Sequence, residues 1–192
     1  MPRFTRAELE SFRDAEVPDL IGPSGGTGVR LLFVGINPGL WTAATQTHFA
    51  HPGNRFYPAL HRAGILLDPI DPAAGMTDVD RVAVLARGIG ITNLVRRATA
   101  RADELSAAEL RAGGEALTEL VGRVRPRVVA VAGITAYRSA FGVRRATAGR
   151  QPQGWAGAEL WVVPNPSGLN AHETVDSLAL AYAEPARAAG IL

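Results

Sequence analysis

The sequence predicts an α/β fold, a three-layer sandwich in which helices flank a central, mainly parallel β-sheet. Segments of strand character alternate with segments of helical periodicity along the chain. Residues 127–133 form a run rich in valine and alanine, which is typical of a parallel strand buried on both faces. The strands expected at residues 30–36, 88–95 and 159–164 each run into a polar turn, and in a parallel sheet such turns gather at one edge.

The first 28 residues are expected to form an extension, with a helix within residues 1–20 and a glycine-rich connector after it, and residues 29–192 a single catalytic domain. Thr5 and Glu8 fit a capping box, in which each side chain satisfies a free backbone amide at the start of a helix. Residues 22–28 are rich in glycine and predict a flexible connector. They lack the Gly-Lys-Ser/Thr ending of a phosphate-binding loop and precede a strand instead of following one.

The helices of the main domain follow from the spacing of apolar residues. This spacing predicts helices, in chain order, over residues 54–63, 78–87, 106–124, 135–141 and 174–189. Ser106 and Glu109 form a second capping box at the start of the longest helix. Pro185 lies inside the last helix, which it should bend or divide because proline cannot donate the helical hydrogen bond.

Composition limits the classes of function. The chain has 192 residues, enough for one domain with its own core, and a formal net charge of +2. It contains no cysteine, which excludes disulfides, thiolate nucleophiles and cysteine-held zinc or iron–sulfur sites. No apolar run approaches the ~20 residues that cross a bilayer, and the first residues lack the apolar core of a signal peptide. We therefore expect a soluble cytoplasmic protein.

All 20 basic residues are arginine, and lysine is absent. Arginine suits bidentate contacts with phosphate, but a GC-rich genome also favours arginine codons. The basic stretch at residues 96–101 is open to the same two interpretations, a solvated surface turn or a phosphate contact.

Three asparagines follow strands of the predicted sheet. Asn37 comes directly after the first strand, Asn93 ends the second, and Asn165 follows the last. Since the carboxyl ends of parallel strands meet at one edge, these carboxamides are expected to line one cleft.

The residues around this cleft exclude several kinds of chemistry. Ser167 has no evident base beside it and lies outside a Gly-x-Ser-x-Gly turn. His48 and His51 are three residues apart, but no His-Glu-x-x-His pattern accompanies them, so neither a metal nor another cofactor is expected. Amides, backbone donors and an aromatic ring suit a site that binds a planar polar heterocycle and positions a water molecule.

The motifs at residues 35–40, 49–56 and 165–169 closely resemble those of the mismatch-specific uracil-DNA glycosylase family, the bacterial relatives of thymine-DNA glycosylase. The resemblance covers roughly residues 30–185 and includes residues 91–95 and the Gly113-Gly114 pair. It implies the fold of the uracil-DNA glycosylases. It also implies an enzyme that flips a base out of the duplex and hydrolyses its bond to deoxyribose, leaving an abasic site.

The resemblance also implies roles for individual residues on the base side of the pocket. Asn37 would position the attacking water. Backbone amides near Ile36 and Phe49 would bind the base and stabilise its developing negative charge, as an oxyanion hole does. The ring of Phe49 would stack on the flipped base, and Asn165 would contribute to base binding.

The second loop of the family implies a wedge that enters the gap left by the flipped base. Gly168, Leu169 and Asn170 would form this wedge and face the opposite strand. Relatives typically have Gly-Leu-Ser-Arg here, whereas this chain has Ala171 in place of the arginine, and Asn170 or His172 would have to replace its contact with the opposing guanine. Some relatives have a lysine or another polar residue where this chain has Asn93, whose role stays open.

The expected function is therefore monofunctional excision of uracil, and of thymine or damaged bases, from mismatched double-stranded DNA. Without lysine, no lysine Schiff base with the sugar can form. We expect a monomer that needs no cofactor, acting on the nucleoid of a bacterium. Two alternatives remain: the same fold acting on another deaminated or alkylated base, such as hypoxanthine, xanthine or ethenocytosine, and a catalytically silent module that binds lesions.

Overall fold

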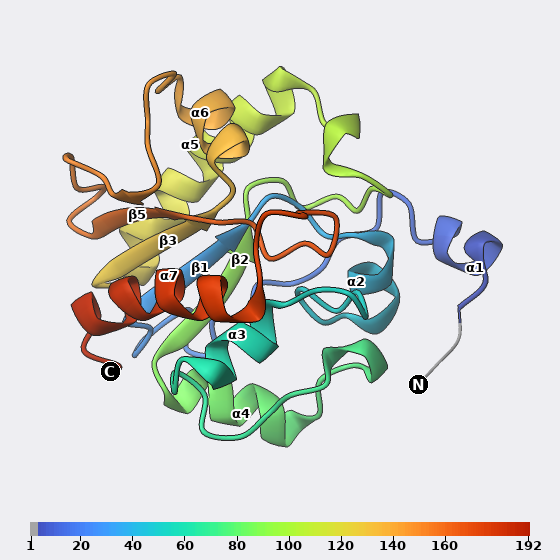
Figure 1. The fold of residues 1–192 in the computed structure, drawn as a ribbon. Helices are drawn as coiled ribbons and strands as arrows, with labels where there is room; N and C mark the ends of the chain where they lie inside the picture. The colour runs from blue at the N-terminus through green and yellow to red at the C-terminus, as the bar shows by residue number, and fades with distance from the viewer. Residues whose placement is uncertain (1–3) are drawn as a thin grey trace.

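The computed structural model describes residues 4–192 and contains one five-stranded sheet in the order β2-β1-β3-β5-β4 (Figure 1). The four longer strands are parallel to their neighbours, and the two-residue β4 pairs antiparallel with β5 at the edge. This confirms the predicted α/β class. The strands are β1 (Leu31–Gly35), β2 (Ile89–Asn93), β3 (Val128–Ala132), β4 (Gly149–Arg150) and β5 (Glu159–Val163).

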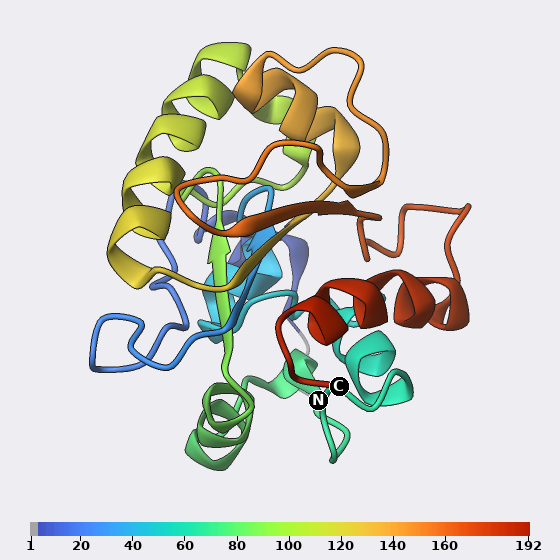
Figure 2. The ribbon, with the colours of Figure 1, turned by 90° about the vertical axis from the view of Figure 1, so that its left-hand side faces the viewer.

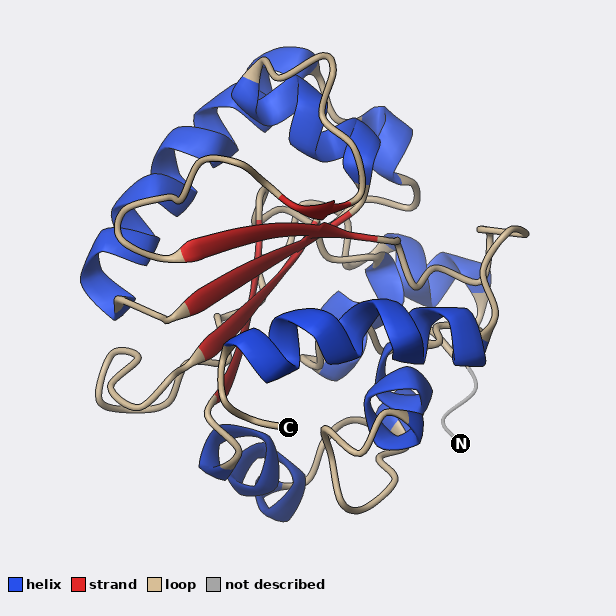
Figure 3. Ribbon diagram, turned by 60° about the vertical axis from the view of Figure 1, so that its left-hand side comes forward, coloured by secondary structure: helices blue, strands red, loops and turns tan. Residues whose placement is uncertain are grey.

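Helices cover both faces of the sheet, as Figures 2 and 3 show. One layer contains α5 and α6, and the other contains α3, α4 and α7. The helices are α1 (Arg6–Glu10), α2 (Leu40–Thr45), α3 (Phe56–Arg62), α4 (Asp78–Ala86), α5 (Ala107–Val124), α6 (Ile134–Phe141) and α7 (Val175–Ala188). Two short 3-10 helices, Pro72–Ala74 and Ala102–Glu104, lie in the connections.

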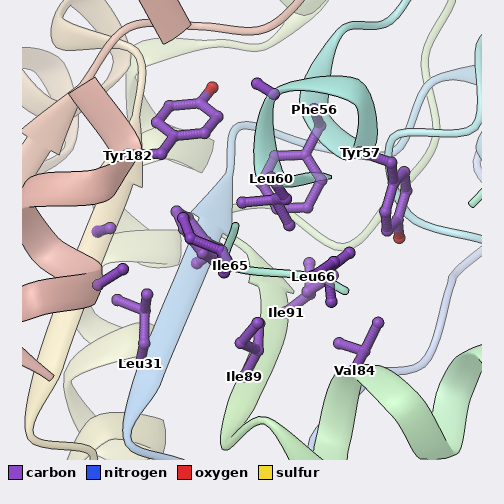
Figure 4. Close-up of a cluster of buried hydrophobic side chains, with 14 of the residues drawn as sticks. Leu31, Phe56, Tyr57, Leu60, Ile65, Leu66, Val84, Ile89, Ile91 and Tyr182 are labelled. Atoms are coloured by element: carbon purple, nitrogen blue, oxygen red, sulfur yellow. The ribbon is translucent and has the colours of Figure 1, made fainter. Parts of the chain in front are cut away.

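The core has two halves because successive side chains of a strand point to opposite faces. In β1, Leu31 and Phe33 pack in the half that α3 and α7 cover, whereas Leu32 and Val34 pack in the half that α5 covers. Figure 4 shows the first half, where aromatic and branched aliphatic side chains meet over the sheet. No helix among residues 4–192 has both the length and the apolarity to span a bilayer.

Two helices of the main domain depart from the predicted elements. Helix α2 was not predicted, because six residues directly after a Pro-Gly turn give too short a periodic pattern. Of the two outcomes expected at Pro185, a bend or a division of the last helix, division is wrong, because α7 continues through Pro185 as one helix. Pro185 lies buried near the C-terminal end of α7, so packing compensates for its missing hydrogen bond.

The N-terminal extension packs against the main domain. The capping box of Thr5 and Glu8 is present, but α1 ends at Glu10, earlier than the sequence suggests. Farther along, Leu20 exchanges two backbone hydrogen bonds with Ile91, at 2.8 and 2.9 Å, and so covers the edge of β2. The extension therefore covers an edge strand that would otherwise expose its hydrogen-bonding groups.

Candidate active site

The carboxyl ends of β1, β2 and β5 open into one pocket with a volume of about 730 Å³. In Figure 1 the loop between β5 and α7 lies across this end of the sheet. Asn93 lines the pocket, and so does every site residue that the sequence predicts, namely Ile36, Asn37, Phe49, Asn165, Gly168, Leu169 and Asn170. The three asparagines expected at the edge of the sheet thus share one cleft.

The amide group of Asn37 has a fixed orientation. Its Nδ2 donates to Oγ1 of Thr99 at 2.7 Å and lies 3.1 and 3.2 Å from the carbonyl oxygens of Pro38 and Arg97. The Thr99 hydroxyl donates in turn to the carbonyl of Arg101, so its oxygen accepts from Asn37. Among residues 4–192, Oδ1 of Asn37 accepts no hydrogen bond. This oxygen is available to a water molecule or a ligand.

Asn93, whose role the sequence leaves open, presents its amide oxygen beside a glycine. Its Oδ1 lies against the Cα of Gly35, where a Cβ atom would clash with it. The ring of Phe49 borders the same space, 3.2 Å from the position that a Cβ would take. Glycine at position 35 therefore keeps the space between the amide oxygen and the aromatic ring open.

Phe49 is held so that its ring borders the pocket. The ring stacks on Phe56, with centroids 4.1 Å apart and an angle of 25° between the planes. Phe56 is fully buried, so the stack is anchored in the core. The backbone of Phe49 has φ of 56°, a left-handed conformation that is rare for a bulky residue and costs free energy. Such strain is characteristic of functional positions.

His48 is buried beside Asn93. Its Nε2 lies 2.9 Å from the carbonyl oxygen of Pro18, and its Nδ1 lies 3.1 Å from Nδ2 of Asn93. Burial lowers the pKa of His48, which keeps the imidazole neutral. His51 also lines the pocket, and its Nδ1 accepts from the backbone amide of Gly53. No group of three His, Cys, Asp or Glu side chains within the described chain is arranged to hold a metal ion.

The loop from residue 165 to residue 170 forms the opposite wall. Leu169 at its tip is 86% exposed, so no core contact occupies its side chain. Inside the loop, Oδ1 of Asn165 accepts from the backbone amide of Ser167, and Nδ2 of Asn170 donates to the carbonyl of Asn165. The amide nitrogen of Asn170 thus stabilises the loop.

Arg55 connects this loop to the rest of the pocket through hydrogen bonds, a structural role that the sequence does not reveal. Its Nη2 donates to the carbonyls of Ser167 and Asn170 at 2.6 and 2.7 Å, and its Nη1 donates to the carbonyl of Glu173. Its backbone amide also donates to Pro166 at 3.0 Å. The only signal in the sequence is that Arg55 belongs to the motif at residues 49–56.

Acidic residues already pair with the arginines of the loop at residues 96–101. Nε of Arg97 lies 2.6 Å from Glu109, and its Nη1 lies 2.9 Å from Asp14. Arg101 pairs with Asp103 at 2.7 Å, and its hydrogen bond lowers the pKa of that exposed carboxyl group. Asp103 is the one carboxylate among the described residues that line the pocket, and this pairing keeps it ionised.

Two amide oxygens and one aromatic ring therefore converge on the pocket. Chemically, Oδ1 of Asn93 can accept a hydrogen bond from an N–H group beside Phe49, and Oδ1 of Asn37 can accept one from a water. Against known families, residues 23–184 match the model of the uracil DNA glycosylase superfamily. Since this match spans most of the chain, the protein belongs to the uracil DNA glycosylase superfamily, whose members are typically DNA N-glycosylases.

Proposed function

We propose that this protein is a monofunctional glycosylase that removes uracil from mismatched double-stranded DNA. The observation that carries the proposal is the orientation of Asn37. Its amide nitrogen is engaged by Thr99 and by backbone carbonyls, which leaves its oxygen toward the pocket. A carboxamide held in this way orients water without competing for the hydrogen bonds of the base.

Base recognition would involve Phe49 and Asn93. Uracil is planar and presents an N–H group between two carbonyl oxygens, whereas cytosine presents an unprotonated ring nitrogen at the same place. The oxygen of Asn93 accepts a hydrogen bond from the first and is repelled by the second. Stacking on Phe49 contributes about 1–3 kcal/mol to holding a flipped base. The site thus favours uracil and thymine over cytosine.

In the reaction, the bond between C1′ of the sugar and N1 of the base breaks, and its electron pair leaves with the base. Water held by Asn37 then forms a bond to C1′ and loses a proton to solvent, which gives an abasic site and the free base. An amide cannot accept that proton, so we expect slower turnover than with a carboxylate at position 37. Backbone donors near Ile36 and Phe49 would stabilise the anionic base.

Leu169 would fill the space that the flipped base leaves in the duplex, because its side chain is exposed and comes from a loop clamped by Arg55. The same loop would also contact the opposite strand. Mismatches would be favoured because a mispaired base leaves the duplex at a lower cost in free energy.

The test is single-turnover cleavage of duplexes that contain one G·U, G·T, G·hypoxanthine or normal pair, followed by alkali to cut abasic sites. We expect G·U to react fastest and normal pairs not at all. The Asn37→Ala variant should lose about 1000-fold in rate while still binding the G·U duplex. Cleavage of hypoxanthine alone would assign another base to the pocket, and binding without cleavage would assign a lesion-binding module.

Monofunctional chemistry has its own test. Because the chain contains no lysine, borohydride should trap no covalent complex with DNA, unless the N-terminal amine reacts. EDTA should leave the rate unchanged. A trapped complex or a metal requirement would contradict the proposed reaction.

A further inference from the structure

Residues 14–20 of the N-terminal extension lie outside the matched residues 23–184, yet they pair with β2 and with the loop that follows it. Backbone hydrogen bonds join Leu20 to Ile91 in β2, two residues before Asn93. Ala15 accepts from the backbone amide of Ala98 at 2.9 Å. This segment is thus paired to the strand and loop that carry the pocket residues.

The carbonyl of Pro18 fixes the position of a proton on His48. A carbonyl oxygen only accepts, so the nitrogen at 2.9 Å from it, Nε2 of His48, must carry the hydrogen. In a neutral imidazole, Nδ1 is then an acceptor, and the group at 3.1 Å from it is the amide of Asn93. Asn93 therefore turns its NH₂ group toward His48 and its oxygen toward Gly35 and the pocket.

We infer that the N-terminal segment and His48 are positioning elements for base selection: Pro18 fixes the tautomer of His48, and His48 fixes which end of the Asn93 amide meets the base. The inference rests on the proposed function, because it concerns how the same pocket distinguishes bases. His48 touches no base and acts only through Asn93.

The direction of this hydrogen-bond chain decides which base is accepted. If His48 gained a proton, both ring nitrogens would donate, and Asn93 would have to turn its oxygen to His48 and its NH₂ to the pocket. That NH₂ group would donate to the unprotonated ring nitrogen of cytosine, whereas it would meet the ring N–H of uracil as a second donor and be repelled. Burial opposes protonation of His48, as do Arg81 on α4 and Arg96 after β2, while Asp19 and the Pro18 carbonyl favour it.

The first experiment measures the pH dependence of single-turnover G·U cleavage. The wild-type rate should fall once the pH drops below the pKa of His48, which lies below the ordinary value of 6.5. His48→Leu, which breaks both hydrogen bonds, should lower the rate by about 10-fold at neutral pH. His48→Gln provides one donor and one acceptor without titrating, so it should recover most of that loss and abolish the acidic fall that His48 causes.

His61→Gln is the matched control, because His61 lies outside the pocket on α3 and its replacement should leave the wild-type profile unchanged. Asp19→Asn keeps an acceptor for Thr92 but removes the charge, so it should move the acidic fall to lower pH. If the cleavage rates of wild type and His48→Gln fell identically at acidic pH, the inference would be overturned. His48→Gln tests it even if His48→Leu fails to fold.

A second experiment does not depend on activity. Nitrogen NMR of the imidazoles should show a neutral His48 with its proton on Nε2, in contact with Pro18, and the side-chain NH₂ signal of Asn93 should shift as His48 titrates. A proton on Nδ1 at neutral pH would refute the hydrogen-bond chain. If NMR shows the hydrogen bonds from Pro18 through His48 to Asn93 but no uracil is released, the proposed function fails while the coupling of His48 to Asn93 stands.

Discussion

The two walls of the pocket are stabilised in opposite ways. On the sheet side, several independent groups hold one side chain, since Thr99, Pro38 and Arg97 all accept from Asn37. On the loop side, one side chain holds several groups, since Arg55 donates to three carbonyls. The first wall should therefore tolerate the loss of one partner, whereas the second depends on a single residue.

Among variants that alter what holds each wall, the largest effect should follow Arg55→Leu, which removes the side-chain bonds to Ser167, Asn170 and Glu173 at once. We expect G·U cleavage to fall by about 100-fold, and the free energy of unfolding by about 2–3 kcal/mol, because three partly buried carbonyls lose charged donors. Cleavage assays and urea unfolding measure the two effects. The control is Arg62→Leu at the C-terminal end of α3, where loss of the exposed pair with Asp176 should change stability by no more than about 0.5 kcal/mol. Equal effects of the two variants would show that Arg55 does not specifically hold the loop that carries Leu169.

The next effect concerns the contact between the walls. A Cβ atom on residue 168 would lie 2.6 Å from the carbonyl oxygen of Gly53, closer than atoms can pack. Gly168→Ala should therefore displace the wedge and lower the rate of G·U cleavage by about 10-fold, the equivalent of roughly 1.4 kcal/mol. Gly122→Ala is a suitable control, because a Cβ there meets open space and alanine favours the helix. Full activity of Gly168→Ala would mean that the loop moves freely against residue 53.

A smaller effect should follow Thr99→Val, which removes one of the three acceptors of the Asn37 amide. The carbonyls of Pro38 and Arg97 remain, so we expect the rate to fall by only about 3-fold. This loss is near the lower end of what one hydrogen bond contributes. Thr99→Ser keeps the hydroxyl and should behave like the wild type in the same assay. A loss as large as that of Arg55→Leu would show that the sheet-side wall also depends on one contact.

The smallest effect should come from Glu109, which supports the same wall from outside through Arg97. The guanidinium of Arg97, with Ser106, holds the pKa of Glu109 at about 2, below its usual 4.5. The stabilisation is therefore complete above pH 4.5 and is lost as the pH falls toward 2. Glu109→Gln should lower the melting temperature slightly at pH 7, and the difference from wild type should shrink in acid. A difference that stays constant with pH would exclude the ion pair as its cause.

Much of the sheet-side wall could be predicted from the sequence because it is encoded locally. An apolar strand that stops at Gly35 places Asn37 at the edge of a parallel sheet, and the same logic places Asn93 and Asn165. The pattern of strands and helices likewise predicted the fold class. In each case the signal lies within a few residues of the feature it predicts.

The remaining features depend on contacts between residues far apart in the chain. Arg55 reaches carbonyls more than 100 residues later, and His48 meets a carbonyl 30 residues earlier. No periodicity or motif spacing encodes such pairs. The amide orientation of Asn93 depends on a tautomer, which only the three-dimensional arrangement determines.

The ion pairs at residues 96–101 have a consequence for how the protein would search DNA. Proteins that bind phosphates with unpaired cations release condensed counterions, and their affinity then falls steeply with salt. Arg97 and Arg101 already have acidic partners, so each phosphate they contact would have to displace a carboxylate. Phosphate contacts made by this loop should then add only weakly to the salt dependence of binding.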